Sequence, residues 1–133
     1  MKEVWKAVTG YEGLYEVSNL GRIRSLDREV ERIDRWSQQI TLIKRQGCIM
    51  DPYTTLKGGY LRIGLSKNGD QKNHLIHRLV ATAFIKNQEN KPQINHINCV
   101  KTDNNVDNLE WNTNTENYLH SVENGLQHYQ NTE

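Results

Sequence analysis

Cysteine is scarce in this sequence, and its pattern excludes several classes of site. Cys48 and Cys99 are the two cysteines among 133 residues, and neither belongs to a closely spaced pair. Zinc sites of the cysteine type and disulfide-rich secreted scaffolds both need several cysteines at regular spacing. The sequence therefore predicts no structural zinc and no disulfide framework, and it favours a reducing compartment.

Long hydrophobic runs are also missing. The first residues, MKEVWKAVTG, contain no apolar segment of the secretory kind. No stretch approaches the roughly 20 apolar residues that a membrane-spanning helix needs. We therefore expect no membrane partner and a cytoplasmic location. The length fits one domain, or one domain with a small appendage.

The chain has no large excess of charge of one sign, because its net charge is only +1, but its basic and acidic residues are unevenly distributed. Residues 56–91 carry seven basic and two acidic residues, a balance of +5, whereas residues 92–133 carry one basic and six acidic residues, a balance of −5. Two interpretations fit equally. One is a phosphate-binding surface beside a cation site. The other is a pair of oppositely charged faces that attract each other.

The first half of the chain shows the alternation of β-hairpins. The segments YEVS and RIRSL, joined by Asn19-Leu20-Gly21, predict one hairpin, and residues 58–75 predict a second, with a turn at residues 67–70. Arg22 and Arg24 share a face and either reach a pair of phosphates or remain solvated. Residues 27–50 leave three alternatives open: a long β-excursion, a short helix or a flexible loop. In the second hairpin, Tyr60 and basic residues suit a ribbon that grips a nucleic-acid backbone.

Residues 74–85, HLIHRLVATAFI, change to a helical period, with two apolar rows that predict a core-facing helix. His77 and Arg78 interrupt its start, and His77 either contacts a phosphate or is packed and hydrogen-bonded. A second helix is expected from about Thr115 to Asn124, capped by one of residues 113–115 and ended by Gly125. We expect Leu119 and Val122 to face the core, and Asn117 and His120, three residues apart, to share a neighbouring face.

The stretch NHINCVKTDNNVDNLEWNTNTEN, residues 95–117, predicts strand, polar loop, strand and helix, with His96 on the first strand. These residues resemble the HNH nucleases, in their phage and intron-associated homing-endonuclease branch. The phrase HRLVATAF also occurs in that branch. The N-terminal segment resembles the nuclease-associated module found before HNH domains, through Trp5, Gly10, Tyr11, Glu12, Tyr15, Val17, Ser18, Asn19, Gly21, Arg22, Ile23 and Ser25.

The resemblance implies an α+β fold, in which a small ββα-metal (His-Me finger) nuclease core follows antiparallel β-hairpins. It implies two parts: an N-terminal, DNA-contacting β module over residues 1–50 and an HNH nuclease domain over residues 51–133. It also implies a location in the cytoplasm of a bacterial host if the gene is phage-encoded.

The resemblance further implies a role for each matching residue. His96 is the general base, and Asn108 hydrogen-bonds the loop and so holds the base strand. Asn117, on the helix, and Asn95, where this branch often has Asp, are implied ligands of one divalent cation, Mg²⁺ or Mn²⁺, with His120 as a further candidate. Oxygen ligands with retained waters suit these ions. Cys99 and Val100 depart from the family loop, which usually has Gly and a polar residue, and we expect them to dry the loop tip.

These residues predict a metal-dependent DNA endonuclease that hydrolyses phosphodiester bonds, with nicking and double-strand cleavage both open. The expected partner is double-stranded DNA, contacted by Arg22, Arg24, Arg62, Lys67, Lys72, His77, Arg78 and Lys101. The main alternative is a DNA-binding protein that keeps the HNH fold without cleavage, for which the neutral Asn95 is the best support. A third possibility is an RNA- or protein-binding module with a borrowed fold.

Overall fold

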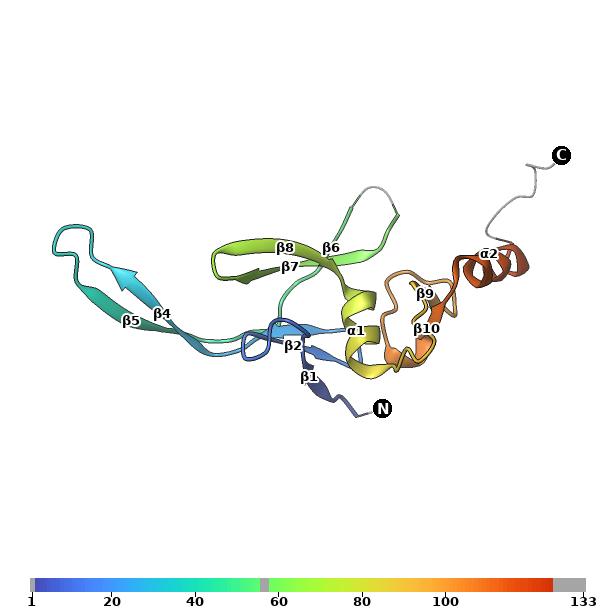
Figure 1. The fold of residues 1–133 in the computed structure, drawn as a ribbon, viewed down its shortest axis with the longest axis horizontal. Coiled ribbons are helices and arrows are strands. Elements are labelled where there is room, and N and C mark those ends of the chain that lie inside the picture. The colour runs from blue at the N-terminus through green and yellow to red at the C-terminus, as the bar shows by residue number, and fades with distance from the viewer. Residues whose placement is uncertain (1, 56–57, 126–133) are drawn as a thin grey trace.

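A computed structural model describes residues 2–55 and 58–125 of the chain. The described part contains two helices, and every strand pair in it is antiparallel, so the predicted α+β class is confirmed. The molecule is elongated, with a two-stranded arm at one end and the second helix at the other (Figure 1).

The N-terminal sheet is the meander β1 (Trp5–Ala7), β2 (Tyr15–Ser18) and β3 (Ile23–Ser25). The predicted hairpin is confirmed, because β2 and β3 pair across the turn at residues 19–22. Gly21 in this turn has φ +88°, a backbone conformation that residues with a Cβ rarely adopt. Val17 and Ile23 bury their side chains in the core beneath the sheet.

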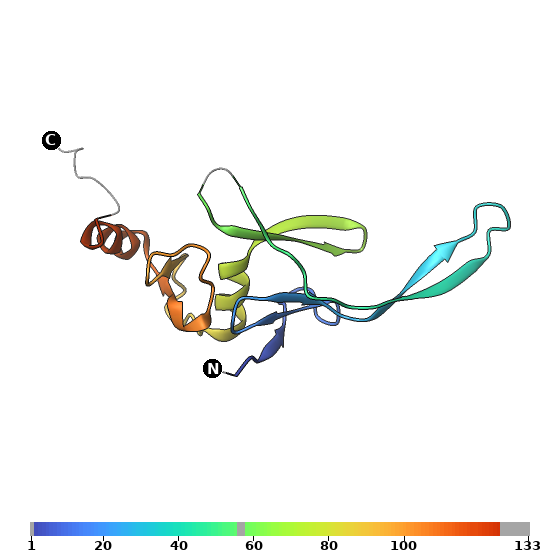
Figure 2. The same ribbon diagram turned by 180° about the vertical axis from the view of Figure 1, so that it is seen from behind.

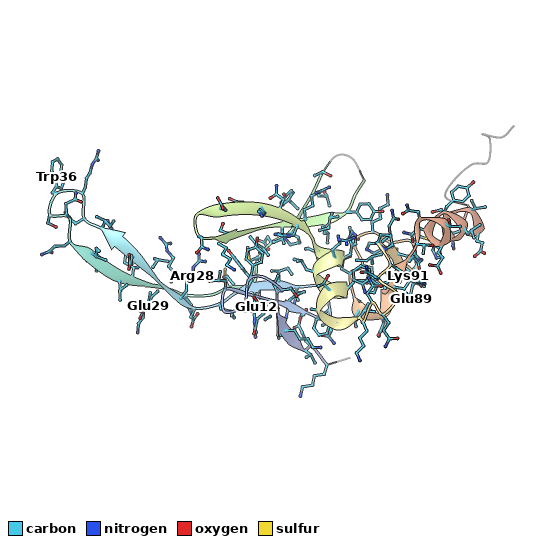
Figure 3. All side chains as sticks on the ribbon, viewed as in Figure 1. Glu12, Arg28, Glu29, Trp36, Glu89 and Lys91 are labelled. Carbon is cyan, nitrogen blue, oxygen red and sulfur yellow. The ribbon has the colours of Figure 1, made fainter. Side chains whose placement is uncertain are left out.

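The arm consists of β4 (Arg28–Ile33) and β5 (Ile40–Arg45), which pair in full register. Of the three alternatives for residues 27–50, the structure has the long β-excursion. The arm extends well beyond the body in both views (Figures 1 and 2), and Trp36 lies at its tip (Figure 3). Trp36 is 89% exposed, so the tip buries almost no apolar surface.

The second hairpin, β7 (Leu61–Lys67) and β8 (Asp70–Leu75), has the predicted turn, and β6 (Tyr53–Thr54) extends its sheet. Helix α1 (Ile76–Phe84) follows at once and places Ile76, Val80 and Ala81 in the core. One continuous core joins these residues to Val17 and Ile23 of the N-terminal sheet. The predicted N-terminal module, residues 1–50, and nuclease domain, residues 51–133, therefore share one core, and their separate functions stay a prediction.

The last unit is the predicted strand, loop, strand and helix. Strand β9 (Gln93–His96) pairs with β10 (Leu109–Asn112), the short 3-10 helix η1 (Val106–Asn108) ends the loop, and α2 (Asn114–Glu123) follows. Thr113 caps α2 in a reciprocal capping box with Glu116. The prediction that Leu119 faces the core was wrong, because it is 50% exposed. Helix α2 packs through its first turns on β9 and β10 and buries no residue fully.

Among the helices of the described residues, none has the length and apolarity that crossing a membrane requires.

Candidate active site

A cavity of about 190 Å³ lies between β9, the loop that follows it and α2. The lining residues come from these elements and from the segment before β7: Tyr60, Gln93, Ile94, Asn95, His96, Cys99, Lys101, Asn117, His120 and Ser121. The structure thus brings together His96, Asn95, Asn117, His120 and Lys101, which the sequence had predicted as site residues. The other predicted DNA contacts and Asn108 do not line this cavity.

His96 is held in one orientation by the loop that follows it. The residue is 5% exposed, and Nε2 lies 2.8 Å from Oδ1 of Asn104. A carbonyl oxygen only accepts hydrogen bonds, so in this amide orientation Nε2 carries the proton and Nδ1 keeps a free lone pair. Burial lowers the pKa of His96, while the Asn104 hydrogen bond and the nearby Asp103 carboxylate oppose that shift. The imidazole is therefore neutral and able to accept a proton at neutral pH.

Asn108 makes the contacts that the family role implies. Its Oδ1 accepts from the backbone N–H of Asn98 at 2.9 Å, and its Nδ2 donates to the carbonyl of Asp103 at 2.9 Å. Its own carbonyl accepts from the N–H of Ile97 at 2.8 Å. Three bonds from one buried residue close the loop, and they fix the end of β9 that carries His96.

Asn104 is a site residue that the sequence analysis did not select. It is 3% exposed, and its Cβ and backbone pack against Gly21 of the N-terminal turn, where an added Cβ would lie 2.9 Å from the Asn104 Cβ. The backbone N–H of Val106 also donates to the carbonyl of Asn19 at 2.8 Å. The N-terminal turn therefore supports the loop that orients His96. The position of Asn104 in the polar loop was visible in the sequence, but its partner was not.

The predicted cation ligands lie in a cluster of amides. Asn117 accepts at Oδ1 from Nδ2 of Asn112 at 3.2 Å and donates from Nδ2 to Oε1 of Gln93 at 2.6 Å. The Nδ2 of Asn95 is buried without a partner among the described residues. His120 lies 3.1 Å from the carbonyl of Ile97 through Nε2. Amide oxygens with spare lone pairs, beside an imidazole, fit a hard divalent cation that also has water and phosphate ligands.

No carboxylate lines this cavity. The acidic residues of the C-terminal part therefore do not line the candidate cation site. Two of them have structural contacts instead: Asp103 accepts from Asn98 and Asn105, and Glu116 caps α2 and pairs with Lys91. Within residues 2–55 and 58–125, no group of three or more His, Cys, Asp and Glu side chains gathers as a metal site.

Two further rings lie against His96. Tyr60 lines the cavity, and its ring centroid lies 5.7 Å from that of His96. Its place in a ribbon that grips a nucleic-acid backbone stays a prediction. His77 is 7% exposed and packs against both rings, which leaves it no access to a phosphate. Packing was predicted correctly for His77, but its Nδ1 has no hydrogen-bond partner among the described residues. Lys101 lies with Nζ 5.0 Å from the Tyr60 centroid.

Cys99 and Val100, the two loop residues that differ from the family pattern, behave differently in the structure. Cys99 has φ +66°, the region that glycine adopts most easily, so the loop keeps a glycine-like backbone with a cysteine in it. Val100 is exposed, so the expected drying of the loop tip was wrong.

The arginines predicted on the N-terminal hairpin already have partners. Arg22 pairs with Glu3, and this hydrogen bond lowers the pKa of Glu3 to about 2. Arg24 pairs with Glu16 and lies over the ring of Trp5, 4.1 Å from its centroid. A phosphate contact by either arginine would have to compete with the carboxylate that already pairs with it.

The basic residues of the second hairpin do not share a face. The register places Lys67 and Lys72 on the side of Leu65, and Arg62 on the other side. Lys67 donates to the carbonyl of Gly10 at 2.8 Å. Arg78, at the start of α1, donates to the carbonyl of Pro92 at 3.2 Å.

The arm carries a basic face that the sequence analysis missed. Arg28 and Arg45 lie directly opposite each other, and Arg32 lies farther along the same face. None of the three forms an ion pair within the described part of the chain. Like charges placed directly across a sheet destabilise it unless an anion is near. The alternation of residues 28–32 could have revealed this face if the strand had been recognised.

Comparisons with known proteins agree with this geometry. Residues 3–66 match the model of the NUMOD4 motif, and residues 74–119 match that of an HNH endonuclease family. A solved structure concerning DNA binding and cleavage by the HNH homing endonuclease I-HmuI is similar over 94% of this chain and 61% of that one, with a TM-score of 0.68 and 30% identity.

Two of the relatives that match in sequence cover more than four fifths of this chain. An uncharacterised HNH endonuclease, L247, of Acanthamoeba polyphaga mimivirus is 36% identical over 129 residues, which are 93% of this chain and 27% of that protein. The DNA endonuclease I-HmuI of Bacillus phage SP01 is 35% identical over 109 residues, 82% of this chain and 52% of that protein. The chain thus spans less than two thirds of the length of each of them. The chain carries a NUMOD4 motif followed by an HNH endonuclease domain, and it belongs to the HNH family.

Proposed function

We propose that this protein is a metal-dependent endonuclease that hydrolyses phosphodiester bonds in double-stranded DNA. The observation that supports this most directly is His96, a neutral imidazole whose Nε2 is engaged by Asn104 and whose Nδ1 is free, in a cavity that also contains Lys101 and the amides of Asn95 and Asn117. Phosphodiester hydrolysis needs a general base for the water, a positive charge such as that of Lys101 near the phosphate, and oxygen ligands for a metal ion, and this cavity offers all three.

In the proposed reaction, Nδ1 of His96 accepts a proton from a water molecule as the water oxygen attacks phosphorus. The bond from phosphorus to the 3′ oxygen breaks, and the products are a 5′-phosphate and a 3′-hydroxyl that takes a proton from solvent. Asn104 keeps the reactive tautomer, and Asn108 keeps the base strand in place. Lys101 offers a positive charge to the phosphate from the cavity wall.

The cation, Mg²⁺ or Mn²⁺, would be held by Asn95 and Asn117, with His120 beside them. When bound, it supplies positive charge that stabilises the charge developing on the phosphate and the leaving oxygen. Because the cavity has no carboxylate, we expect weak cation binding until DNA supplies a phosphate. Electron paramagnetic resonance of Mn²⁺ with the free protein measures this directly.

Substitution of Asn95 tests its place beside the cation. Asn95→Asp adds a full charge next to a divalent ion, and two unit charges about 4 Å apart interact by about 4 kcal/mol at an effective dielectric constant of about 20. Desolvation offsets part of this energy, so we expect the Mg²⁺ concentration for half-maximal cleavage to fall by about tenfold. Identical metal curves for Asn95→Asp, Asn95→Ala and the unchanged protein would remove Asn95 from the cation site.

The DNA would extend from the cavity along the basic surface of the molecule. The unpaired arginines of the arm, Arg28, Arg32 and Arg45, are better placed for phosphates than Arg22 and Arg24, which are already paired. Arg62, Lys67, Lys72 and Arg78 offer further positive charge, although on different faces. Phosphate contacts of this kind position a protein on DNA without reading the sequence.

A plasmid assay tests the function. Supercoiled plasmid incubated with Mg²⁺ or Mn²⁺ should become open-circular or linear, and it should stay supercoiled with EDTA. His96→Ala should slow cleavage by about 10²–10⁴-fold, the usual contribution of a general base, while DNA affinity changes little. Tight DNA binding without cleavage in either metal would establish the alternative, a DNA-binding protein that has lost catalysis, which the neutral Asn95 favours.

A further inference from the structure

A cluster of three rings surrounds His96, and two of its members have no part in the proposed chemistry. Tyr60 comes from the segment before β7, His77 from the first turn of α1, and His96 from the end of β9. The centroids of Tyr60 and His77 lie 5.1 Å apart, those of His77 and His96 5.0 Å, and those of Tyr60 and His96 5.7 Å. Each ring touches both of the others, so none can turn without moving a neighbour.

The angles within this cluster show what each ring restricts. Tyr60 is tilted by 33° from the plane of His96, so it lies across the ring and opposes movement out of that plane. His77 meets His96 at 69° and closes a second side. Offset and edge-on contacts of this kind are favourable for aromatic rings. Asn104 holds Nε2 on another side, which leaves Nδ1 as the free nitrogen.

Both rings are themselves fixed by the fold. His77 lies on α1 beside Ile76, and the same helix is anchored in the core by Val80 and Ala81, which have no exposed surface. Tyr60 comes two residues after Gly58, where an added Cβ would lie 3.3 Å from the Tyr60 ring, so the turn packs closely against that ring. The support for His96 therefore rests on a core helix on one side and on a closely packed turn on the other.

We propose that His77 and Tyr60 are positioning residues that hold the His96 ring so that its free nitrogen faces the cavity. This role rests on the proposed nuclease function. It assigns the buried His77 ring to support of the base, in place of the phosphate contact first considered for it. The contribution comes from the ring surfaces, since Nδ1 of His77 has no partner within the described residues and the contacts are ring to ring.

The charge state of His77 agrees with this role. Burial, with smaller contributions from His96, Arg78 and Arg62, lowers the pKa of His77 to about 4. The ring is therefore uncharged at neutral pH and does not repel the imidazolium that His96 becomes when it takes a proton. A charged side chain at this position would oppose proton transfer to His96.

Two pairs of variants test the proposal in the full chain. Tyr60→Leu and His77→Leu remove the rings and keep apolar volume, whereas Tyr60→Phe and His77→Phe keep a ring. Misplacing a catalytic group by about 1 Å costs up to about 10²-fold in rate, so we expect single-turnover cleavage at saturating DNA to fall by about 10- to 100-fold in the leucine variants. The phenylalanine variants should stay within about fivefold of the unchanged protein.

DNA affinity and folding are measured alongside. The dissociation constant for DNA should change by less than about threefold in all four variants, because a positioning role affects turnover and not binding. Thermal unfolding identifies any variant that fails to fold. Tyr53→Leu is the matched control, since it makes the same chemical change at an exposed tyrosine of β6.

Long-range ¹H–¹⁵N spectra of the histidine rings test the same point without any cleavage assay. We expect the free protein to show His96 with Nε2 protonated. The leucine variants should show nitrogen shifts averaged toward both tautomers, because a ring that is free to move loses its hydrogen bond to Asn104 for part of the time. Absence of cleavage in the unchanged protein would refute the proposed function but leave this spectrum informative. Leucine variants that match the unchanged protein in rate and spectrum would overturn the inference, as would a His77→Phe variant that folds and is as slow as His77→Leu.

Discussion

The hydrogen bond from His96 to Asn104 makes a sharp prediction, because Asn104→Leu removes it at nearly constant volume. The bond is 2.8 Å long and buried, and its acceptor oxygen selects the tautomer with Nδ1 free. A neutral hydrogen bond contributes about 0.5–1.5 kcal/mol net, which corresponds to a tautomer preference of about 2- to 13-fold. Without it the two tautomers become comparably populated.

The expected reduction in rate follows from this magnitude. Removal of the tautomer preference alone inactivates at most about half of the competent protein, because the wrong tautomer then has a similar population. Freedom of the ring adds a larger effect, up to about 10²-fold for a displacement of about 1 Å. We therefore expect Asn104→Leu to slow single-turnover cleavage by about 10- to 100-fold, less than His96→Ala.

The assay compares three proteins at saturating DNA and fixed metal. Asn104→Asp retains an acceptor oxygen at the same position and should recover much of the rate that Asn104→Leu loses. The leucine variant should keep its thermal stability, because it also removes the Asn104 Nδ2, which is buried without a partner among the described residues. An Asn104→Leu variant that cleaves within about twofold of the unchanged protein would refute the assigned role of this bond.

Three further predictions concern the support of the site and the DNA-binding surface. Gly21→Ala should lower the free energy of unfolding in urea by roughly 1–3 kcal/mol more than Gly69→Ala does, because both glycines have positive φ but only Gly21 lies against Asn104. Equal destabilisation by the two substitutions would contradict this contact. The folded-state pKa of His77, about 4, lies below its unfolded value of about 6.5, so its contribution to stability is fully present above pH 6.5 and should fall by about 3 kcal/mol as the pH drops toward 4. His77→Phe should remove this contribution and leave the smaller ones of His74 and His96, whose pKa values burial also lowers; an unchanged pH profile would argue against it. Each arginine–phosphate interaction that is removed lowers the slope of log DNA affinity against log salt concentration by about 0.9. Alanine at Arg28, Arg32 and Arg45 together should therefore reduce this slope by up to about 2.7, and alanine at Arg22 and Arg24 should reduce it less. The reverse order would place the DNA on the N-terminal sheet.

Local sequence patterns predicted most of the elements, because hairpins and helices depend on neighbouring residues. The alternation around residues 15–25 and 61–75 and the helical rows of residues 75–84 are present as strands and α1. The capping residue Thr113 and the glycine-like turns were also visible. The arm stayed one of three alternatives for residues 27–50, because its strands mix charged and apolar residues on both faces and bury little.

The family resemblance selected the residues of the cavity, and the structure brings His96, Asn95, Asn117, His120 and Lys101 together as that selection implied. Their individual roles stay predictions. The resemblance did not select Tyr60, since a tyrosine next to a basic strand looks the same in sequence whether it faces DNA or packs on a histidine. It also passed over Asn104, whose role depends on a ring eight residues earlier.

The sequence by itself determined the local elements, the polar loop after His96 and the membership in the HNH family. Only the tertiary structure decided which side chains are already paired, as with Arg22 and Arg24, and which remain free, as on the arm. It also decided that Gly21 of the N-terminal turn supports Asn104 and that Tyr60 and His77 pack on the base. The physical reason is that these contacts join segments far apart in the chain, and close packing and ion pairing act through space and leave no periodic trace in the sequence.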